Sequence, residues 1–296
     1  MKTKVFMIHD VRDDYKAQYN KRYDVPYFFS KKNFSLRINE LIKKYGKNVF
    51  DNSSLLNSIK TLDYILTFDD GLKDHLWVAR TLNELGLKAI FFIPSAIFDK
   101  KTFVDSHKIQ FLLSVCGEDY ISYEILERIE PSIRKDVLRS YSKSLWKNNI
   151  WSPNTIFCTR FFRSYTNNHL RRSLLNELFE LYVLKNDPLL HEKFYLSNVD
   201  LNEIKDLGHI IGSHGYESLN FDFEAESVIQ KEIEASNIFS ETNSKYKLYA
   251  FANGGFNKFS NDYLIKSNFS YLFTTIPKEW DGKDILVPRL DFSKTL

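Results

Sequence analysis

Short apolar runs alternate along the chain with stretches in which apolar residues recur at helical spacing. The apolar runs predict strands at residues 5–8, 64–68, 89–93, 210–212, 248–251, 271–275 and 285–287. The stretches with helical spacing predict helices at residues 35–45, 74–85, 201–207, 225–239 and 261–267. Glycines such as Gly46 and Gly86 follow these helices, as is common just after a helix end. Strand and helix alternating at this spacing indicate parallel β/α units.

The fold predicted from this alternation is α/β, an irregular (β/α) barrel of about seven strands. Residues 100–200 interrupt the pattern, because helical stretches such as YEILERI and RRSLLNELFELYVL occur there without strands between them. We interpret residues 1–296 as a single barrel domain and residues 100–200 as a helical insertion within it.

Composition narrows the class of protein. A hydrophobic content of 43% over 296 residues favours a sizeable core over disorder. The net charge is only +3, with acidic and basic residues interspersed, so the sequence gives no support for nucleic-acid binding. Two cysteines, Cys116 and Cys158, lack CxxC spacing, which makes a reducing compartment the default.

The N-terminal apolar run ends at His9 and Asp10. It is too short for the core of a signal peptide, and we interpret it as the first strand. No apolar run approaches about 18 residues, the length of a membrane span. From the sequence we therefore expect a cytoplasmic protein with no membrane span, whose oligomeric state the sequence leaves open.

The strand at residues 64–68 ends in two adjacent carboxylates, Asp69 and Asp70, followed by Gly71. In parallel β/α folds the carboxyl ends of the strands line the functional face. Adjacent carboxylates repel each other unless a cation or a strong donor compensates. One of the two could therefore bind a metal while the other accepts a proton. The alternative is that Asp-Asp-Gly forms only a turn or a helix cap.

Two further strands end in candidate polar residues. His214 follows the strand at residues 210–212, and a neutral imidazole is a natural metal ligand, although a single histidine is more often a hydrogen-bonded structural residue. The strand at residues 248–251 runs toward Asn253 and Gly254, where backbone can approach a ligand and present N–H groups. A simple turn is the alternative there.

Together these stretches resemble the polysaccharide deacetylase family, which has the NodB-homology domain. The family's first motif, TFDDG, is present unchanged at residues 67–71. Its second motif is a His-x-x-x-His turn after a strand, of which His214 is present while Ser218 replaces the second histidine. Its third motif, an Arg-Pro-Pro-x-Gly strand end, keeps only its glycine, Gly254.

The resemblance extends to both ends of the chain. Residues 7–11 look like the Tyr-His-x-Val opening of many members, and residues 287–290 resemble the Pro-Arg-Ile close of some branches. The leucine-histidine motif that supplies the family's general acid is not visible. The resemblance covers roughly residues 1–98 and 200–292 and does not explain the insertion.

The resemblance implies a hydrolase acting on the C–N amide bond of an N-acyl sugar or activated sugar precursor, with one divalent metal ion, expected to be zinc. Asp70 and His214 would bind the metal, and Asp69 would accept a proton from water. Asn253 and Gly254 would contact the substrate, with a nearby backbone N–H stabilising the oxyanion.

Arg289, which follows the strand at residues 285–287, could pair with Asp69 in place of the absent third-motif arginine and keep that carboxylate ionised. An ion pair unrelated to the site is the alternative for Arg289.

Ser218 leaves the third metal ligand open, because catalytic zinc usually has three protein ligands and water. His9, His107, Glu217, Ser218 itself and water are the candidates. We rank His9 and His107 first, each as third ligand or as the missing general acid, and assign His9 to the metal and His107 to catalysis. A non-catalytic relative that binds a sugar or a partner enzyme is the competing hypothesis, and an O-acetyl hydrolase is a weaker one.

Overall fold

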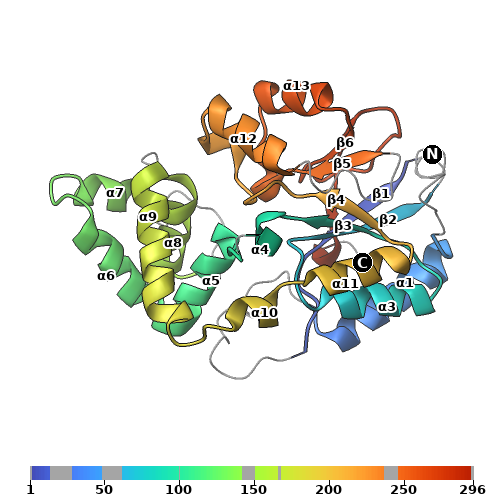
Figure 1. Ribbon diagram of the computed structural model, residues 1–296, viewed down its shortest axis with the longest axis horizontal. Helices are drawn as coiled ribbons and strands as arrows, with labels where there is room; N and C mark the ends of the chain where they lie inside the picture. The colour runs from blue at the N-terminus through green and yellow to red at the C-terminus, as the bar shows by residue number, and fades with distance from the viewer. Residues whose placement is uncertain are drawn as a thin grey trace. The chain divides into compact units, whose positions relative to one another are not determined.

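A computed structural model describes residues 2–13, 29–48, 62–99, 101–141, 151–165, 168–236 and 246–294. These residues form two compact units (Figure 1). The first contains the described residues of 1–14, 26–102 and 191–296, and the second contains those of 103–190.

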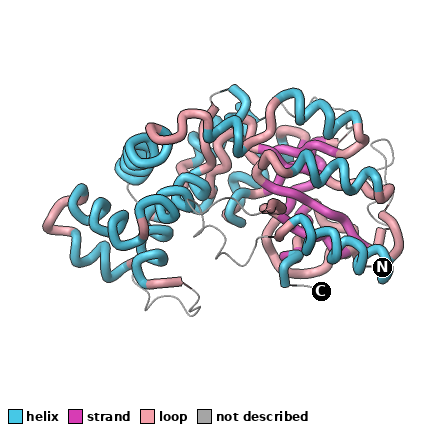
Figure 2. The backbone as a smooth tube through the Cα atoms, turned by 90° about the horizontal axis from the view of Figure 1, so that it is seen from below, coloured by secondary structure: helices cyan, strands magenta, loops and turns pink. Residues whose placement is uncertain are grey.

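The first unit is built on a parallel sheet, whose strands are magenta in Figure 2. The strand order is β7-β6-β5-β4-β3-β2-β1-β8. Its strands are β1 (Lys4–Ile8), β2 (Tyr64–Asp69), β3 (Ile90–Ile93), β4 (Ile210–Ser213), β5 (Lys247–Ala250), β6 (Phe269–Phe273), β7 (Leu286–Val287) and β8 (Leu290–Asp291). The sheet curls into a half-barrel, so the predicted α/β class and barrel-like parallel sheet are confirmed. Only β8 has no counterpart among the predicted strands.

Helices lie beside both halves of this sheet. They are α1 (Lys31–Tyr45), α3 (His75–Glu84), α4 (Ala96–Asp99), α10 (Leu190–Phe194), α11 (Asn198–Asp206), α12 (Glu226–Ser236) and α13 (Lys258–Lys266). In Figure 1, α1, α3 and α11 lie beside the part of the sheet that holds β1 to β4, and α12 and α13 lie beside β5 and β6. The last part of the predicted helix at 225–239, from residue 237, lies outside the described residues.

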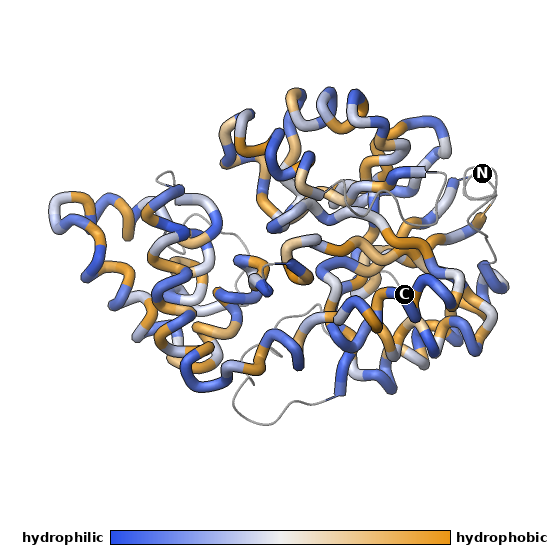
Figure 3. Tube along the Cα trace, in the orientation of Figure 1, coloured by the Kyte–Doolittle hydropathy of each residue, from blue (hydrophilic) through white to orange (hydrophobic). Residues whose placement is uncertain are grey.

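Alternating side chains on β5 pack into two different cores. Leu248 and Ala250 belong to the core inside the half-barrel, whereas Tyr249 packs outward with Ile229 and Ile233 of α12. Successive strand residues point to opposite faces, so a strand covered on both faces is apolar along its whole length. The strands in Figure 3 are accordingly mainly hydrophobic, while α1 and α3 mix hydrophobic and hydrophilic positions.

Trp280 closes the amino end of the half-barrel. It is buried and forms two backbone hydrogen bonds with Thr3, just before β1: the Thr3 N–H donates to the Trp280 carbonyl at 2.8 Å, and the Trp280 N–H donates to the Thr3 carbonyl at 2.9 Å. Its indole N–H donates to the carbonyl of Asp284 at 3.0 Å. Because the strands are parallel, the candidate residues at their carboxyl ends lie at the opposite end.

The second unit is helical throughout its described residues. Its helices are α5 (Asp105–Cys116), α6 (Glu118–Arg128), α7 (Arg134–Ser140), α8 (Pro153–Ser164), α9 (Asn168–Phe179) and a π-helix, η3 (Glu180–Leu184). The Phe103 ring packs against the rings of Phe111 and Phe179, with centroids 5.9 and 4.8 Å away. Whether this unit is an insertion within one domain stays a prediction. No helix in the described part of the chain is long and apolar enough to cross a membrane.

Candidate functional site

The two aspartates of the TFDDG stretch lie at the carboxyl end of β2. Asp69 ends the strand, and Asp70 and Gly71 follow with φ of 81° and 65°. A Cβ atom on Gly71 would lie 2.8 Å from Ile93 Cγ2 and 2.9 Å from Ile97 Cδ1, so this position requires glycine. A left-handed aspartate costs about 1 kcal/mol, and such strain is typical of functional sites.

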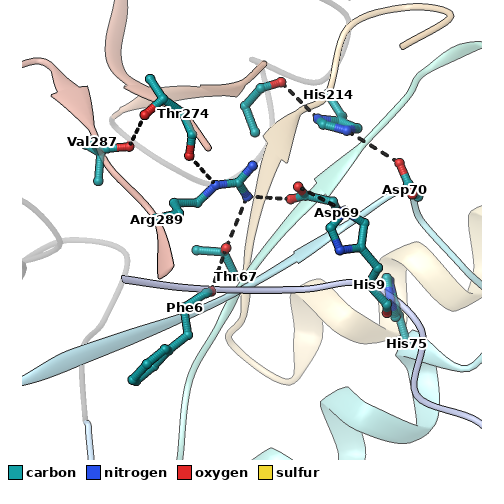
Figure 4. Close-up of polar contacts among 11 residues, drawn as sticks. Phe6, His9, Thr67, Asp69, Asp70, His75, His214, Thr274, Val287 and Arg289 are labelled. Atoms are coloured by element: carbon teal, nitrogen blue, oxygen red, sulfur yellow. Dashed lines mark hydrogen bonds and ion pairs between the residues drawn. The ribbon is translucent and has the colours of Figure 1, made fainter. Parts of the chain in front are cut away.

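Arg289 lies buried against Asp69, as the sequence predicts (Figure 4). Its Nη1 donates to Asp69 Oδ1 at 2.7 Å and to Thr67 Oγ1 at 3.2 Å. Its Nε donates to the carbonyl of Thr274 at 3.1 Å. The guanidinium also lies over the Phe92 ring, 5.6 Å from its centroid. These contacts fix the planar guanidinium in one orientation, with one edge toward the carboxylate.

The ionisation of Asp69 is controlled by this surrounding charge. Burial by itself would raise the pKa of the Asp69 carboxyl, but Arg289 and then His214 and His9 lower it, and the net pKa lies below its ordinary value. Asp69 is therefore a buried carboxylate at neutral pH, able to accept a proton.

His214 follows β4 and faces Asp70 (Figure 4). Its Nδ1 lies 2.8 Å from the carbonyl oxygen of Ala250, so an N–H at Nδ1 donates to that carbonyl. Its Nε2 then faces Asp70 Oδ1 at 3.4 Å, and both side chains are buried. In this tautomer the imidazole Nε2 and the carboxylate are both acceptors, so a proton or a cation has to lie between them. Burial lowers the pKa of His214, but Asp69 and Asp70 raise it by more, and its net pKa is above the ordinary value.

Hydrogen bonds tie the turn after His214 to the segment after β3. The carbonyl of Gly215 accepts from the Ser95 N–H at 3.1 Å, and the carbonyl of Tyr216 accepts from the Ala96 N–H at 2.9 Å. The Tyr216 hydroxyl donates to Asp99 Oδ2 at 2.9 Å. The turn that follows His214 is therefore held against the neighbouring strand end.

Ser218 lies in the same turn, buried and with φ of 63°. Glu217 precedes it and donates its backbone N–H to Glu232 Oε1 at 2.8 Å. Glu232 is not among the residues predicted from the sequence, because a single acidic residue on the apolar side of a helix forms no motif. Whether Glu217 or Ser218 completes a metal site stays a prediction.

Asn253 and Gly254 follow β5, the strand beside β4. Asn253 is exposed with φ of 52°, and Gly254 has φ of 74°. A Cβ on Gly254 would lie 2.1 Å from Thr275 Oγ1, and one on Gly255 would lie 1.6 Å from Asn220 Oδ1. A side chain at either glycine would therefore displace the neighbouring Thr275 or Asn220 side chain, and the positive φ of Gly254 favours glycine in addition. The proposed contact of Asn253 and Gly254 with a substrate stays a prediction.

Several solved structures of deacetylases share this fold. The Streptococcus pyogenes deacetylase PplD, in complex with acetate, matches 98% of this chain and 92% of its own, with a TM-score of 0.60 and 10% identity. A de-N-acetylase from Aggregatibacter actinomycetemcomitans matches 100% of this chain and 97% of its own, with a TM-score of 0.55 and 15% identity. IcaB from Ammonifex degensii matches 98% of this chain and 91% of its own, with a TM-score of 0.54 and 11% identity.

The chain has the polysaccharide deacetylase fold. The predicted resemblance is thus confirmed at the level of the fold. No family model and no curated protein sequence matches this sequence. The fold is shared with the three structures above at 10 to 15% identity.

His9 lies at the end of β1 in this deacetylase fold, beside Asp69. Its Nε2 is 3.8 Å from Asp69 Oδ2, and 36% of its side chain is exposed. The buried ring of His75 donates from Nε2 to the carbonyl of His9 at 2.8 Å and so fixes the backbone there. The described residues contain no group of three or more His, Cys, Asp or Glu that could hold a metal ion. The assignment of His9 to the metal stays a prediction.

His107 belongs to the second unit of the deacetylase-like chain. It lies in the first turn of α5, and its side chain is buried. Its backbone N–H donates to the carbonyl of Val104 at 2.9 Å. Its catalytic role stays a prediction.

Proposed function

We propose that this protein is a divalent-metal-dependent hydrolase that removes an acyl group, N-acetyl in the first instance, from a sugar or sugar precursor in surface polysaccharide metabolism. One observation carries the proposal: His214 Nε2 and Asp70 Oδ1 are both buried and lie 3.4 Å apart, next to a second carboxylate. The deacetylases with the same fold support removal of an acetyl group as the reaction.

The donor set fits a small divalent ion such as zinc. Imidazole nitrogen and carboxylate oxygen are both zinc ligands, and the second nitrogen of His214 is bonded to a backbone carbonyl, as is usual for a metal-binding histidine. His214 and Asp70 would hold the ion, and water or the Ser218 hydroxyl would complete the coordination. When bound, the ion would lower the pKa of a water molecule and polarise the acyl carbonyl.

The chain's own residues supply the proton chemistry. Asp69, kept ionised by Arg289, accepts the proton of the attacking water. Arg289 orients the carboxylate through Oδ1 and leaves Oδ2 on the side where His9 lies. The backbone N–H groups near Asn253 would donate to the oxyanion that forms when water attacks the acyl carbonyl.

Two measurements test this function. Zinc binding is measured on the purified chain, and acetate release is measured with N-acetylglucosamine oligomers, a nucleotide-linked N-acetyl sugar and an O-acetylated sugar. We expect the protein to bind zinc and to release acetate from an N-acetyl substrate. A chelator should stop this release. A protein that binds no zinc, cobalt or nickel, and that none of these ions protects from thermal unfolding, would rule the proposal out.

A non-catalytic sugar-binding or partner-binding protein is the second candidate. Ser218 in place of a histidine favours it, together with the lack of a three-residue metal group in the described residues. Sugar binding without zinc binding and without acetate release would distinguish it from the hydrolase.

A further inference from the structure

Glu232 of α12 is a buried carboxylate that lies against the turn after β4. Only 4% of the residue is exposed, and its helix neighbours Ile229 and Ile233 are core residues. Burying a carboxylate in such surroundings is unfavourable unless strong donors compensate. The groups that donate hydrogen bonds to the Glu232 carboxylate therefore have to offset the cost of its burial.

The donors are backbone N–H groups of that turn. Glu232 Oε1 accepts from the N–H of Glu217 at 2.8 Å and from that of Leu219 at 3.3 Å. These two residues bracket Ser218, whose φ is 63°. Backbone N–H groups on both sides of a left-handed residue converge on a single anion. The carboxylate thus stabilises the unusual conformation at the position where the related family has its second histidine.

Glu232 also approaches the residue directly after His214. A Cβ on Gly215 would lie 2.6 Å from Glu232 Oε1 and 3.1 Å from the hydroxyl oxygen of Tyr249. Gly215 has φ of 81°, so both its conformation and its space require glycine. Burial and the charge of Glu232 raise the pKa of Tyr249 well above its ordinary value, so this neighbour remains a neutral phenol. Carboxylate, phenol and turn are packed without room for another side chain at Gly215.

We infer that Glu232 is a positioning residue that holds the turn of residues 215–219 in the conformation that keeps His214 opposite Asp70. The inference rests on the proposed metal function and deepens it. A metal site with only two buried protein ligands, one imidazole nitrogen and one carboxylate, depends strongly on both ligands being held in place. Few other contacts favour the geometry that binds the ion. Glu232 thus adds to the backbone bonds that Ser95 and Ala96 donate to Gly215 and Tyr216 in the same turn.

The test compares Glu232→Ala, Glu232→Gln and a control, Ile233→Val, which loosens the packing of the same helix but keeps the Glu232 carboxylate. Hydrogen exchange reports the amides of Glu217 and Leu219 in the metal-free protein, and a chelator competition gives the zinc dissociation constant. We expect Glu232→Ala to speed exchange of both amides and to weaken zinc binding about 10- to 100-fold, as loss of an outer-shell partner does. Glu232→Gln keeps an acceptor oxygen and should lose about threefold, because a neutral acceptor is weaker than an ionised one.

The two readouts separate the inference from the proposed function. If Glu232→Ala speeds exchange at both amides but the protein never binds zinc, Glu232 does anchor the turn and the proposed metal function is overturned. The inferred effect of Glu232 on metal binding would then be overturned as well. Unchanged exchange and unchanged zinc affinity in folded Glu232→Ala would overturn the inference. If Glu232→Ala does not fold, Glu232→Gln decides: a zinc affinity and exchange equal to those of Ile233→Val would overturn it.

Discussion

At the scale of single residues, two adjacent carboxylates have different surroundings. Asp69 pairs with the buried guanidinium of Arg289, whereas Asp70 faces the imidazole of His214. A permanent cation keeps Asp69 ionised, while a titratable neighbour can release its proton to make room for a metal ion. Neighbouring carboxyl groups in different environments commonly have different roles, which is why one is expected to accept protons and the other to bind the ion.

The first prediction concerns these two aspartates. Asp70→Asn should lose zinc binding, because an amide oxygen carries no charge to balance the ion. Asp69→Asn should retain zinc but lose turnover, since an amide cannot accept the proton from water. Metal content and acetate release are measured on the same samples. Full metal content and activity in Asp70→Asn would show that the roles are wrongly assigned.

The second prediction concerns Ser218. Histidine is among the residues that tolerate a left-handed backbone such as the one found at this position, φ 63°. Ser218→His would add an imidazole beside the two proposed zinc ligands, and we expect zinc affinity to rise by about tenfold or more. Ser218→Asn is the matched control, because asparagine tolerates the same backbone but supplies no imidazole. Equal affinities in both variants would mean that position 218 does not face the ion.

At the scale of secondary structure elements, the sequence predicts those strands that are buried on both faces. β2 and β3 are entirely buried, and their uninterrupted apolar runs reveal them. β8 pairs only Leu290 and Asp291 with β1, which is too short for any periodic signal. Helix starts depend on capping: α13 begins at Lys258, before the predicted start at 261, because Asn257 and Ser260 form a capping box.

Part of the candidate site could likewise be predicted from the sequence. Strand order brings the ends of β2 and β4 to either side of β3, so Asp70 and His214 could be expected to meet. Glu232 could not be, because its contact with the turn depends on how α12 packs against β5. That packing is a tertiary property that no local pattern of the sequence carries.

The third prediction concerns His209, between α11 and β4. Its Nε2–H donates to the carbonyl of Ala79 at 2.9 Å, and its Nδ1 accepts from the N–H of Ala89 at 3.2 Å. Burial lowers the pKa of His209 to about 4. In the unfolded chain the pKa is about 6.5, so between these values the unfolded chain binds a proton that the folded chain does not. The free energy of unfolding should therefore fall with decreasing pH over this window, by up to about 3 kcal/mol.

The measurement for His209 is urea unfolding at several pH values between 7 and 4, on the wild type and on His209→Gln, whose amide does not titrate. Subtracting one pH dependence from the other removes the contribution of all other groups. The wild type should lose more stability than the variant as the pH falls. Parallel curves would mean that His209 takes up its proton in the folded protein as readily as in the unfolded chain.

At the scale of the whole molecule, nearly all candidate residues belong to the first unit. Asp69, Asp70, His214 and Arg289 come from the curled sheet, and His107 is the one candidate in the helical unit. The sequence shows that the helical stretches interrupt the β/α pattern. It does not show which residues form a separate compact body, because that division depends on contacts between side chains far apart in the chain.

The last prediction follows from this division. An ion bound by Asp70 and His214 stabilises the folded first unit, by about 2.7 kcal/mol when its concentration is 100 times the dissociation constant. Amides of β2, β3 and β4 that exchange only on unfolding should then exchange about 100-fold more slowly with zinc. Amides of α5 and α9, which have a core of their own around Phe103 and Phe179, should keep their rates. Asp70→Asn serves as the control and should show no zinc effect in either unit. Equal slowing in both units would mean that they unfold as one cooperative body, and no slowing in β2 to β4 would mean that the ion is bound elsewhere.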